Sequence, residues 1–362
     1  MRALVIYRVD RGVQSNIGVV YKLLGQVRGL EALGYHVDYV IHDKIGIYKS
    51  GKKIAKASDN LFFKWRYYDK ISDEHLAGYD LYIYRYGLST RSFIKCLRRT
   101  RSLNRASTIC IDMPTYPYAY EWEGVKGRFA MLIDGYWSSH LRKYVNRIMH
   151  SGMESMIHGV ATVRITNGVD LNRLHVRQIN SDKGLRLLAI GKWRSWHGLD
   201  RLIKGMASAK RDGLSVHLDV IGEGDELPRL ERIVSSMNIK DRVIFHRTLT
   251  GSELDSLFDQ ADLGVGTLGL HRKNVMFDSS LKHREYVARG LPFILAGRDV
   301  DIPAHLGFTI QMTPDDSDLD LSSISESYEK LDLYYLISKM RSYAEQHLSW
   351  TSKMKTLLDE LS

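Results

Sequence analysis

The sequence is poor in cysteine and proline and has no long hydrophobic run. Its 362 residues include two cysteines, Cys96 and Cys110, and six prolines. Two cysteines allow at most one disulfide and offer no metal-ligand spacing, which fits a reducing compartment. No apolar stretch approaches the roughly 18 residues of a membrane span, and the apolar start at residues 3–7 is too short for a signal peptide. We therefore expect a cytoplasmic protein without a metal.

The chain carries an excess of basic residues. Its formal net charge is +10, which suits nucleic acid, an anionic membrane surface or a phosphorylated substrate. Basic residues concentrate at 91–105 and at 49–56, and the second cluster precedes an aromatic run at 61–68. Basic residues beside Phe62, Phe63, Trp65 and Tyr67 suit a bilayer interface. The alternative is a solvated helix face beside aromatic residues that point into the core.

Short apolar segments alternate with segments of helical periodicity along the whole chain. The first half has candidate strands at residues 4–7, 36–41, 81–84, 108–111 and 160–165, and the second half has them at 185–190, 216–221, 243–245, 263–265 and 293–296. Between them, apolar spacing predicts helices such as one at 20–30 and one at 137–148. Thr250 and Glu253 form a candidate capping box for a helix at 254–261. This alternation predicts an α/β fold of two doubly wound halves that meet near residue 170.

Residues 261–296 form the most informative stretch. Two buried strands flank a helix that begins near Ser280 and is closed by Gly290 and Pro292. This order puts a helix N-terminus at the carboxyl edge of a sheet, where free amides and the helix dipole favour phosphate. Glu285 lies about one turn into the helix, where its carboxylate could accept hydrogen bonds from a ribose diol.

The same stretch resembles the nucleotide-sugar site of retaining GT-B glycosyltransferases of family four, in which two glutamates seven residues apart lie beside the sugar and the ribose. Glu285 matches the second glutamate, Phe277 occupies the first position, and Asp278 lies one position further on. The run SSLKHREYVARGLPFI is similar to a segment of capsular and exopolysaccharide biosynthesis glycosyltransferases. The resemblance implies a GT-B fold, with two Rossmann-like domains that face each other across a cleft. Residues 1–168 would bind the acceptor, residues 169–342 would bind the nucleotide sugar, and a helix at 343–362 would return to the first domain.

Further motifs follow the predicted strands of the second half. In GKWRSWHG (191–198), Lys192 and His197 stand where the resembled enzymes carry the two cations that clamp the diphosphate; the alternative is a surface turn. Gly222 begins a Gly-x-Gly turn that is too short for a dinucleotide fingerprint but is similar to a turn near the nucleotide in these transferases. His246 and Arg247 would then offer backbone groups to the base.

The first half carries candidate residues in two loops. Asn16 and Gly18 lie in a loop that resembles one facing the donor phosphates and the acceptor, although two glycines also suit a turn without function. Asp112 and Tyr116 lie in a proline-rich aromatic loop, in which Asp112 would orient a hydroxyl near the donor sugar; a structural cis-proline turn is the alternative.

The resemblance implies a retaining hexosyltransferase that uses a nucleotide sugar, UDP-linked in our prediction, and a lipid-linked saccharide at the inner face of the membrane. No cofactor and no nucleic acid are expected. We predict Asp112, Lys192 and Lys282 as catalytic residues, and Asn16, Tyr116, His271 and Arg272 as acceptor contacts. The predicted donor contacts are Gly18, Lys192, His197, Gly222, His246, Arg247, Ser280, Leu281, Lys282 and Glu285. The alternatives are a non-catalytic basic protein of the same fold that binds nucleic acid or membrane, and a UDP-sugar epimerase.

Overall fold

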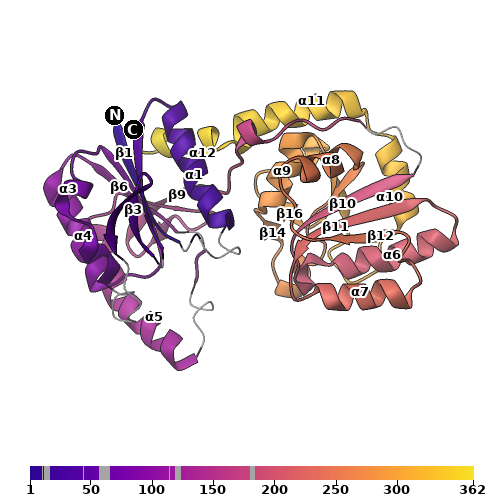
Figure 1. Cartoon of the computed structure of the whole chain (residues 1–362), viewed down its shortest axis with the longest axis horizontal. Helices are drawn as coiled ribbons and strands as arrows, with labels where there is room; N and C mark the ends of the chain where they lie inside the picture. The colour runs from indigo at the N-terminus through magenta and orange to yellow at the C-terminus, as the bar shows by residue number, and fades with distance from the viewer. Residues whose placement is uncertain are drawn as a thin grey trace. The chain divides into compact units, whose positions relative to one another are not determined.

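The chain forms two compact units. The computed structural model describes residues 1–9, 11, 17–43, 45–56, 66–113, 115–118, 124–179 and 184–362. The first unit is Met1–Gly168 together with Trp350–Ser362, and the second is Val169–Ser349 (Figure 1). Residues 343–349 therefore belong to the second unit, and the segment that returns to the first unit starts at Trp350 and not at Tyr343.

The first unit is built on a mainly parallel sheet. Its strand order among the described residues is β4-β3-β2-β1-β5-β6-β7-β9-β8. The parallel strands are β1 (Arg2–Arg8), β2 (His36–His42), β5 (Leu81–Arg85), β6 (Thr108–Asp112), β7 (Arg147–His150) and β9 (Val160–Arg164). The antiparallel edge strands are β3 (Gly46–Lys49), β4 (Lys52–Lys56) and β8 (Met156–Ile157). The chain reverses its winding direction between β1 and β5, which is the switch point of a doubly wound sheet.

Helices cover both faces of this sheet because successive strand residues point to opposite sides. Val5 and Tyr7 pack with α1 (Ile17–Ala32) and α12 (Trp350–Asp359), which lie side by side in Figure 1. Leu4 and Ile6 pack on the other side, with α3 (Asp73–Leu76) and α4 (Arg91–Leu103). Glycine allows α12 to approach α1 closely, because a Cβ on Gly25 would lie 2.1 Å from the Trp350 ring. Further along the chain, α5 (Gly124–Ser138) precedes β7.

The second unit has a wholly parallel sheet of order β12-β11-β10-β13-β15-β17. Its strands are β10 (Leu185–Lys192), β11 (Val216–Glu223), β12 (Val243–His246), β13 (Leu263–Val265), β15 (Phe293–Ala296) and β17 (Thr309–Met312). A small sheet pairs β14 (Phe277–Asp278) with β16 (Arg298–Asp299). Helices α6 (Leu199–Arg211), α7 (Leu227–Ser236) and α10 (Leu321–Glu329) pack on one face, and α8 (Ser252–Gln260), α9 (Leu281–Arg289) and α11 (Leu333–Tyr343) pack on the other. The switch point lies between β10 and β13.

Two secondary-structure predictions are wrong. The helix predicted over 137–148 is the end of α5, a 3-10 turn at Leu141–Lys143 and strand β7. The apolar residues that suggested this helix are spread over these three elements, so their helical spacing is accidental. The predicted capping box is also absent, since α8 is preceded by Gly251 and has no side-chain cap.

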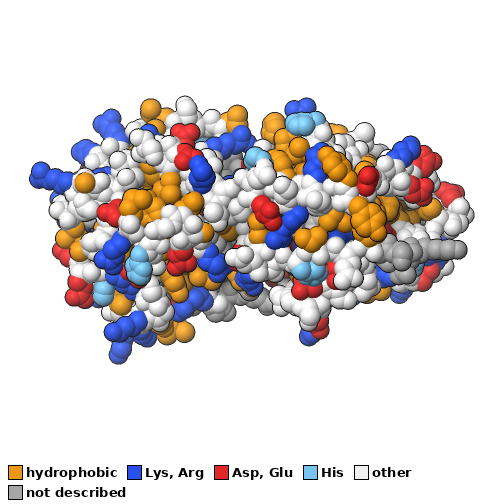
Figure 2. All heavy atoms as spheres, turned by 90° about the horizontal axis from the view of Figure 1, so that it is seen from above, with side chains coloured by type: hydrophobic (Ala, Val, Ile, Leu, Met, Phe, Trp, Pro, Cys, Tyr) orange, Lys and Arg blue, Asp and Glu red, His pale blue; other side chains and the backbone are white. Residues whose placement is uncertain are grey.

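Of the four aromatic residues predicted at a bilayer interface, only Tyr67 belongs to the described residues. Phe62, Phe63 and Trp65 lie outside the described residues, and Tyr67 is a core residue, 2% exposed, whose ring stacks on His42 at 4.5 Å. On the face drawn in Figure 2, Lys and Arg side chains are interspersed with Asp and Glu. None of the helices in the described part of the chain combines the length and apolarity that a membrane span requires.

Candidate active site

The N-terminus of α9 lies at the carboxyl edge of the second unit's sheet, beside the switch point. Ser280 precedes the helix in an extended conformation and makes no side-chain cap. A capping side chain would accept from the amide of Lys282 or His283, and the Ser280 side chain does not do so. The amide of Leu281 also belongs to the first turn, where no helix carbonyl serves as partner. Gly290 ends the helix with φ of 76°, a left-handed conformation that glycine adopts without strain. The predicted start and end of this helix are confirmed.

Lys282 brings a buried positive charge to this edge. Its side chain is 6% exposed, and its Nζ donates a hydrogen bond to the carbonyl of Gly266, directly after β13, at 2.9 Å. Burial lowers the pKa of Lys282 to about 8, and the charge of Asp278 offsets part of that shift. The ammonium thus lies next to the switch point with a neutral carbonyl, and not a carboxylate, as its hydrogen-bond acceptor.

His197 lies near Lys282 and belongs to the loop after β10. Its Nδ1 lies 3.0 Å from the backbone amide nitrogen of Arg194, which donates to it, and 3.3 Å from the Arg194 carbonyl oxygen. The shorter contact favours the neutral ring with its proton on Nε2. Burial, reinforced by the charge of Lys282, lowers the pKa of His197 to about 3. The ring of Trp193 links the two residues: it lies 5.4 Å from Lys282 Nζ and 5.4 Å from the His197 ring. His197 is therefore a neutral donor beside a cation.

The two glycine-containing turns at this edge support each other. Lys192 is exposed at the end of β10 and lies in register with Glu223 of β11. A Cβ on Gly222 would come within 2.0 Å of the Gly191 carbonyl oxygen, and a Cβ on Gly224 would come within 2.1 Å of the Trp193 carbonyl oxygen. Glycine at these positions allows the close packing that holds the 191–198 loop.

Glu285 lies one turn into α9 and is partly buried, with 23% of its side chain exposed. Its Oε1 accepts a hydrogen bond from Arg289 Nε at 3.1 Å, whereas Oε2 has no hydrogen-bond partner among the described residues. Burial raises the pKa of Glu285, and the charge of Arg289 offsets part of the shift. One carboxylate oxygen is thus left to accept hydrogen bonds.

The position of the missing first glutamate is exposed. Phe277 is 57% exposed, and the next residue, Asp278, accepts hydrogen bonds from the Thr267 hydroxyl at 2.8 Å and from the Ser279 amide at 2.7 Å. The charge of Asp278 raises the pKa values of both Lys282 and His197, against the larger effect of burial. Asp278 therefore lies close enough to act electrostatically on both residues.

Four predicted contacts of the second unit have other partners or stand apart. His246 Nε2 lies 2.6 Å from Asp219 Oδ1, and Arg247 is exposed next to it, after the edge strand β12. Arg272 makes two hydrogen bonds to Asp200, at 2.8 and 3.1 Å, and one to Asp316 at 2.7 Å. His271 Nε2 lies 3.1 Å from the same Asp316. The charge of Arg272 is therefore neutralised within the unit, which does not favour the predicted acceptor contact.

In the first unit, Asp112 is the centre of a buried ion cluster. Its Oδ1 accepts from Lys22 Nζ at 2.8 Å, and its Oδ2 accepts from the Tyr7 hydroxyl at 2.6 Å and from Arg85 at 2.8 Å. Burial would raise the pKa of Asp112, but Lys22 and Arg85 hold it well below its ordinary value. Both oxygens of Asp112 are thus engaged in neutralising these cations, and the hydroxyl-orienting role of Asp112 stays a prediction.

Two of the remaining predicted residues of the first unit, Gly18 and Tyr116, belong to the described residues. Gly18 is in the first turn of α1, and Tyr116 is half-buried, with its ring 5.9 Å from those of Tyr118 and His158. Asn16 lies outside the described residues. The donor and acceptor roles of these residues stay predictions.

Sequence analysis missed three residues that shape these edges. Trp193, which we considered for a surface turn, is fully buried, and its indole N–H donates to the carbonyl of Ile221 at 3.2 Å. Arg85 and Asp112 directly follow two predicted strands and pair in register, so their opposite charges were a usable signal. Lys22 gave no comparable signal, since it lies among apolar residues of α1.

Comparison with known proteins agrees with this fold. Residues 173–268 match the family model described as Glycosyl transferases group 1. This range contains β10 to β13 and the His197 loop, and it ends before α9. No curated protein sequence matches the chain.

Solved structures match almost the whole chain at low sequence identity. A glycosyltransferase from Rickettsia africae is 11% identical with a TM-score of 0.65, and covers 99% of this chain and 97% of its own. A sucrose-phosphate synthase from Thermosynechococcus elongatus is 15% identical with a TM-score of 0.63, over 100% and 99% of the two chains. HepE from Anabaena, in complex with UDP and glucose, is 12% identical with a TM-score of 0.59, over 100% and 99%.

These likenesses show the GT-B fold with its two Rossmann-like domains, so the predicted fold class is confirmed. The match to the family of group 1 glycosyl transferases at residues 173–268 supports a glycosyltransferase enzyme, as we predicted from the sequence.

Proposed function

We propose that the protein is a retaining hexosyltransferase. It moves a hexose from a UDP-linked donor to a lipid-linked saccharide, in the biosynthesis of a cell-surface polysaccharide. The proposal rests on the family match at 173–268 and on the resemblance of the α9 segment to capsular and exopolysaccharide enzymes. The acceptor and the peripheral position at the inner face of the membrane come from that resemblance. HepE, whose structure contains UDP and glucose, makes UDP the first nucleotide to test.

One observation carries the proposal: the first turn of α9 and the loop after β10, whose His197 is close enough for the Lys282 charge to lower its pKa, offer three kinds of anion-binding group. They are the Lys282 ammonium, the Nε2–H of neutral His197 and the uncapped amides of the first helical turn. Helix N-termini and buried cations both stabilise phosphate. A diphosphate is the ligand class that uses all three at once.

These groups also act in the chemical step. When the glycosidic bond breaks, the departing nucleoside diphosphate gains negative charge, and donors fixed in a buried site stabilise that charge without rearranging. Lys282 supplies a full charge, and His197 supplies a hydrogen bond. Lys192, exposed at the end of β10, adds a second cation, and Glu285 Oε2 anchors the ribose diol.

The direct test is calorimetric titration with UDP. We expect Lys282→Ala to weaken UDP binding at least tenfold, since loss of a charged hydrogen-bond partner costs about 1.5–3 kcal/mol. Lys240→Ala is the matched control, because Lys240 is an exposed lysine of the same unit, and it should bind UDP like the wild type. Wild-type affinity in Lys282→Ala would remove this assignment.

Assays with UDP-sugars and nucleic acids distinguish the proposed transferase from an epimerase and from a non-catalytic binding protein. Slow hydrolysis of one UDP-sugar without acceptor supports a transferase, whereas interconversion of two UDP-sugars identifies an epimerase. Nanomolar binding to DNA or RNA that falls steeply with salt, with no effect of nucleotides, identifies a nucleic-acid-binding protein. A thermal-shift panel of nucleotide sugars selects the donor, because a ligand at 100 times its dissociation constant stabilises by about 2.7 kcal/mol.

A further inference from the structure

Helix α5 of the first unit turns its large apolar side chains outward. The exposed residues are Val125 at 84%, Phe129 at 63%, Leu132 at 73% and Tyr136 at 65%. Their spacing of four, three and four residues puts them on one side of the helix. The buried residues are Gly127, Ala130, Asp134 and Ser138. This polarity is the reverse of that of an ordinary surface helix, which buries its apolar side.

Asp134 fixes the helix in this orientation. Its Oδ1 accepts hydrogen bonds from the Tyr86 hydroxyl and the Ser89 amide, both at 2.6 Å, and its Oδ2 accepts from the Tyr118 hydroxyl at 2.6 Å. Rotation of α5 to bury the apolar stripe would leave a carboxylate and several buried donors without partners, which is costly. The hydrogen bonds of Asp134 on the buried side of α5 therefore keep the apolar stripe exposed.

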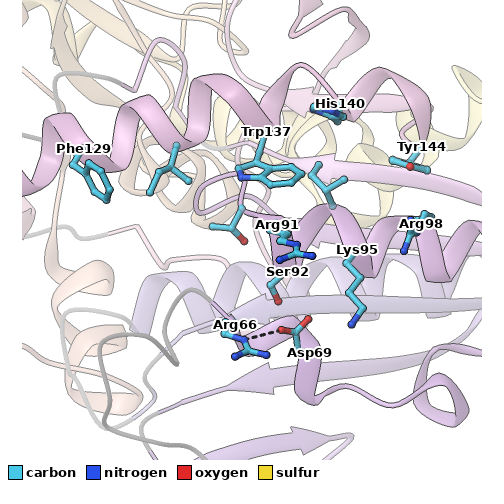
Figure 3. Close-up of a pocket in the computed structure, with 13 residues that line it drawn as sticks. Arg66, Asp69, Arg91, Ser92, Lys95, Arg98, Phe129, Trp137, His140 and Tyr144 are labelled. Carbon is cyan, nitrogen blue, oxygen red and sulfur yellow. Dashed lines mark hydrogen bonds and ion pairs between the residues drawn. The ribbon is translucent and has the colours of Figure 1, made fainter.

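A groove with a cavity volume of about 840 Å³ runs between α5 and α4. Phe129, Trp137 and His140 line it from the α5 side, and Arg91, Lys95 and Arg98 line it from α4 (Figure 3). The three cations recur after four and three residues, so they share one side of α4, and all three are exposed. The groove thus has an aromatic wall and a cationic wall.

The charge of the groove is strongly positive. Asp69 is the single acidic residue among the described residues that line it, and it pairs with Arg66, Nε to Oδ2, at 3.2 Å. Three further cations remain on the α4 wall. Aromatic and aliphatic side chains beside uncompensated cations match the boundary between acyl chains and lipid phosphates.

We infer that the α4–α5 surface is the bilayer-contacting face of the protein, with the α5 stripe at the acyl boundary and the α4 cations on phosphates of anionic phospholipid. The inference rests on the proposed function in that a lipid-linked acceptor requires the enzyme at a membrane. It names the surface that makes the contact. A second copy of the chain is a poorer occupant, because an isologous pairing would oppose like charges.

Vesicle flotation of the full chain tests this surface. The wild type should float with phosphatidylcholine vesicles that contain phosphatidylglycerol, and added salt should release it. The double variant Phe129→Asn/Leu132→Asn should bind at least about tenfold more weakly, since each side chain loses apolar burial. Tyr334→Asn is the control, because Tyr334 is an even more exposed aromatic residue of the second unit, at 82%.

Charge variants test the other wall. Lys95→Gln and Arg98→Gln should each weaken binding to the anionic vesicles about fivefold, the effect of one cation near such a surface. Lys240→Gln should leave binding unchanged. A wild type that stays unbound, or a double variant that floats like the wild type, overturns the inference. So does a dimer in sedimentation equilibrium that Leu132→Asn abolishes while the vesicles remain unbound.

UDP titration of the same variants separates this inference from the proposed function. We expect UDP affinity to be unchanged in the α4 and α5 variants, because these residues lie in the first unit and α9 lies in the second. If the wild type binds UDP but not the vesicles, the inferred bilayer surface is wrong and the proposed transferase stands. If the wild type binds the vesicles but not UDP, the proposed transferase is wrong and the bilayer surface stands. Unchanged urea midpoints of the variants show that they are folded.

Discussion

Both units bring a lysine to the carboxyl edge of a doubly wound sheet, Lys22 partly buried and Lys282 buried, yet the two lysines have different partners. In the first unit, Lys22 donates to the carboxylate of Asp112, which also holds Arg85. In the second unit, Lys282 donates to the carbonyl of Gly266. The fold is shared, but the first edge pairs its lysine directly with a carboxylate, whereas Lys282 donates to a neutral carbonyl and Asp278 acts on it electrostatically. In our proposal a ligand binds at the second edge, which we call the unfinished edge because its lysine donates to a carbonyl and not to a carboxylate.

The largest expected effect, on stability, comes from removing the carboxylate that neutralises the cations at the first unit's sheet edge. Asp112→Asn leaves Lys22 and Arg85 buried without a counterion, and we expect the free energy of unfolding to fall by about 3 kcal/mol or more, measured by urea denaturation. Asp73→Asn is the matched control: its pair with Arg99 involves an aspartate that is 60% exposed, so the loss should stay under about 1 kcal/mol. Equal losses in the two variants would contradict the role of Asp112.

The unfinished edge should respond to pH through Lys282. Its pKa of about 8 lies below the ordinary 10.5, so the free protein loses the charge as pH rises through 8. A bound diphosphate favours the ammonium, and UDP affinity should therefore fall by up to about tenfold per pH unit above 8. Titrations between pH 7 and pH 9.5, where the diphosphate is already ionised, measure this. Lys282→Met should flatten the profile, and an unchanged profile in that variant would assign the titration to another group.

The same pKa shift predicts a stability effect of opposite sign. Since the unfolded chain binds the Lys282 proton more tightly, the free energy of unfolding should rise between pH 8 and 10.5. His197, with a pKa of about 3 against 6.5, should make stability fall as pH decreases below 6.5. Lys282→Met should remove the first dependence and leave the second, as followed by thermal unfolding without ligand.

A smaller effect distinguishes ribose from phosphate recognition. Glu285→Gln should weaken UDP binding about tenfold through the ribose hydroxyls, and it should bind UDP and 2′-deoxy-UDP more nearly alike than the wild type does. Glu253→Gln, at an exposed glutamate of the same unit, is the control. Full discrimination in Glu285→Gln would place the ribose elsewhere.

The smallest effect is expected at Arg247. It is exposed after the edge strand β12, away from the switch point, so Arg247→Ala should change UDP affinity by less than about twofold, in line with ordinary surface substitutions. A tenfold loss of UDP affinity would mean that the Arg247 side chain, next to the edge strand, contacts the base.

Periodicity predicted most of the fold, because strands buried on both faces are continuous apolar runs and Gly290 ends α9 by its backbone conformation. It failed at 137–148, where three elements share an accidental helical spacing. The site was harder. The sequence shows that Asp112 ends a strand, but not that Lys22 approaches it from α1. It shows a tryptophan after β10, but not that Trp193 turns inward and links His197 to Lys282.

The most direct test of the unfinished edge is a crystal structure of the full chain with UDP bound. Our account predicts the diphosphate against the amides of Leu281 and Lys282, within hydrogen-bond distance of Lys282 Nζ and His197 Nε2, and the ribose on Glu285. A diphosphate bound instead at Lys22 and Arg85, with the start of α9 unchanged, would contradict it.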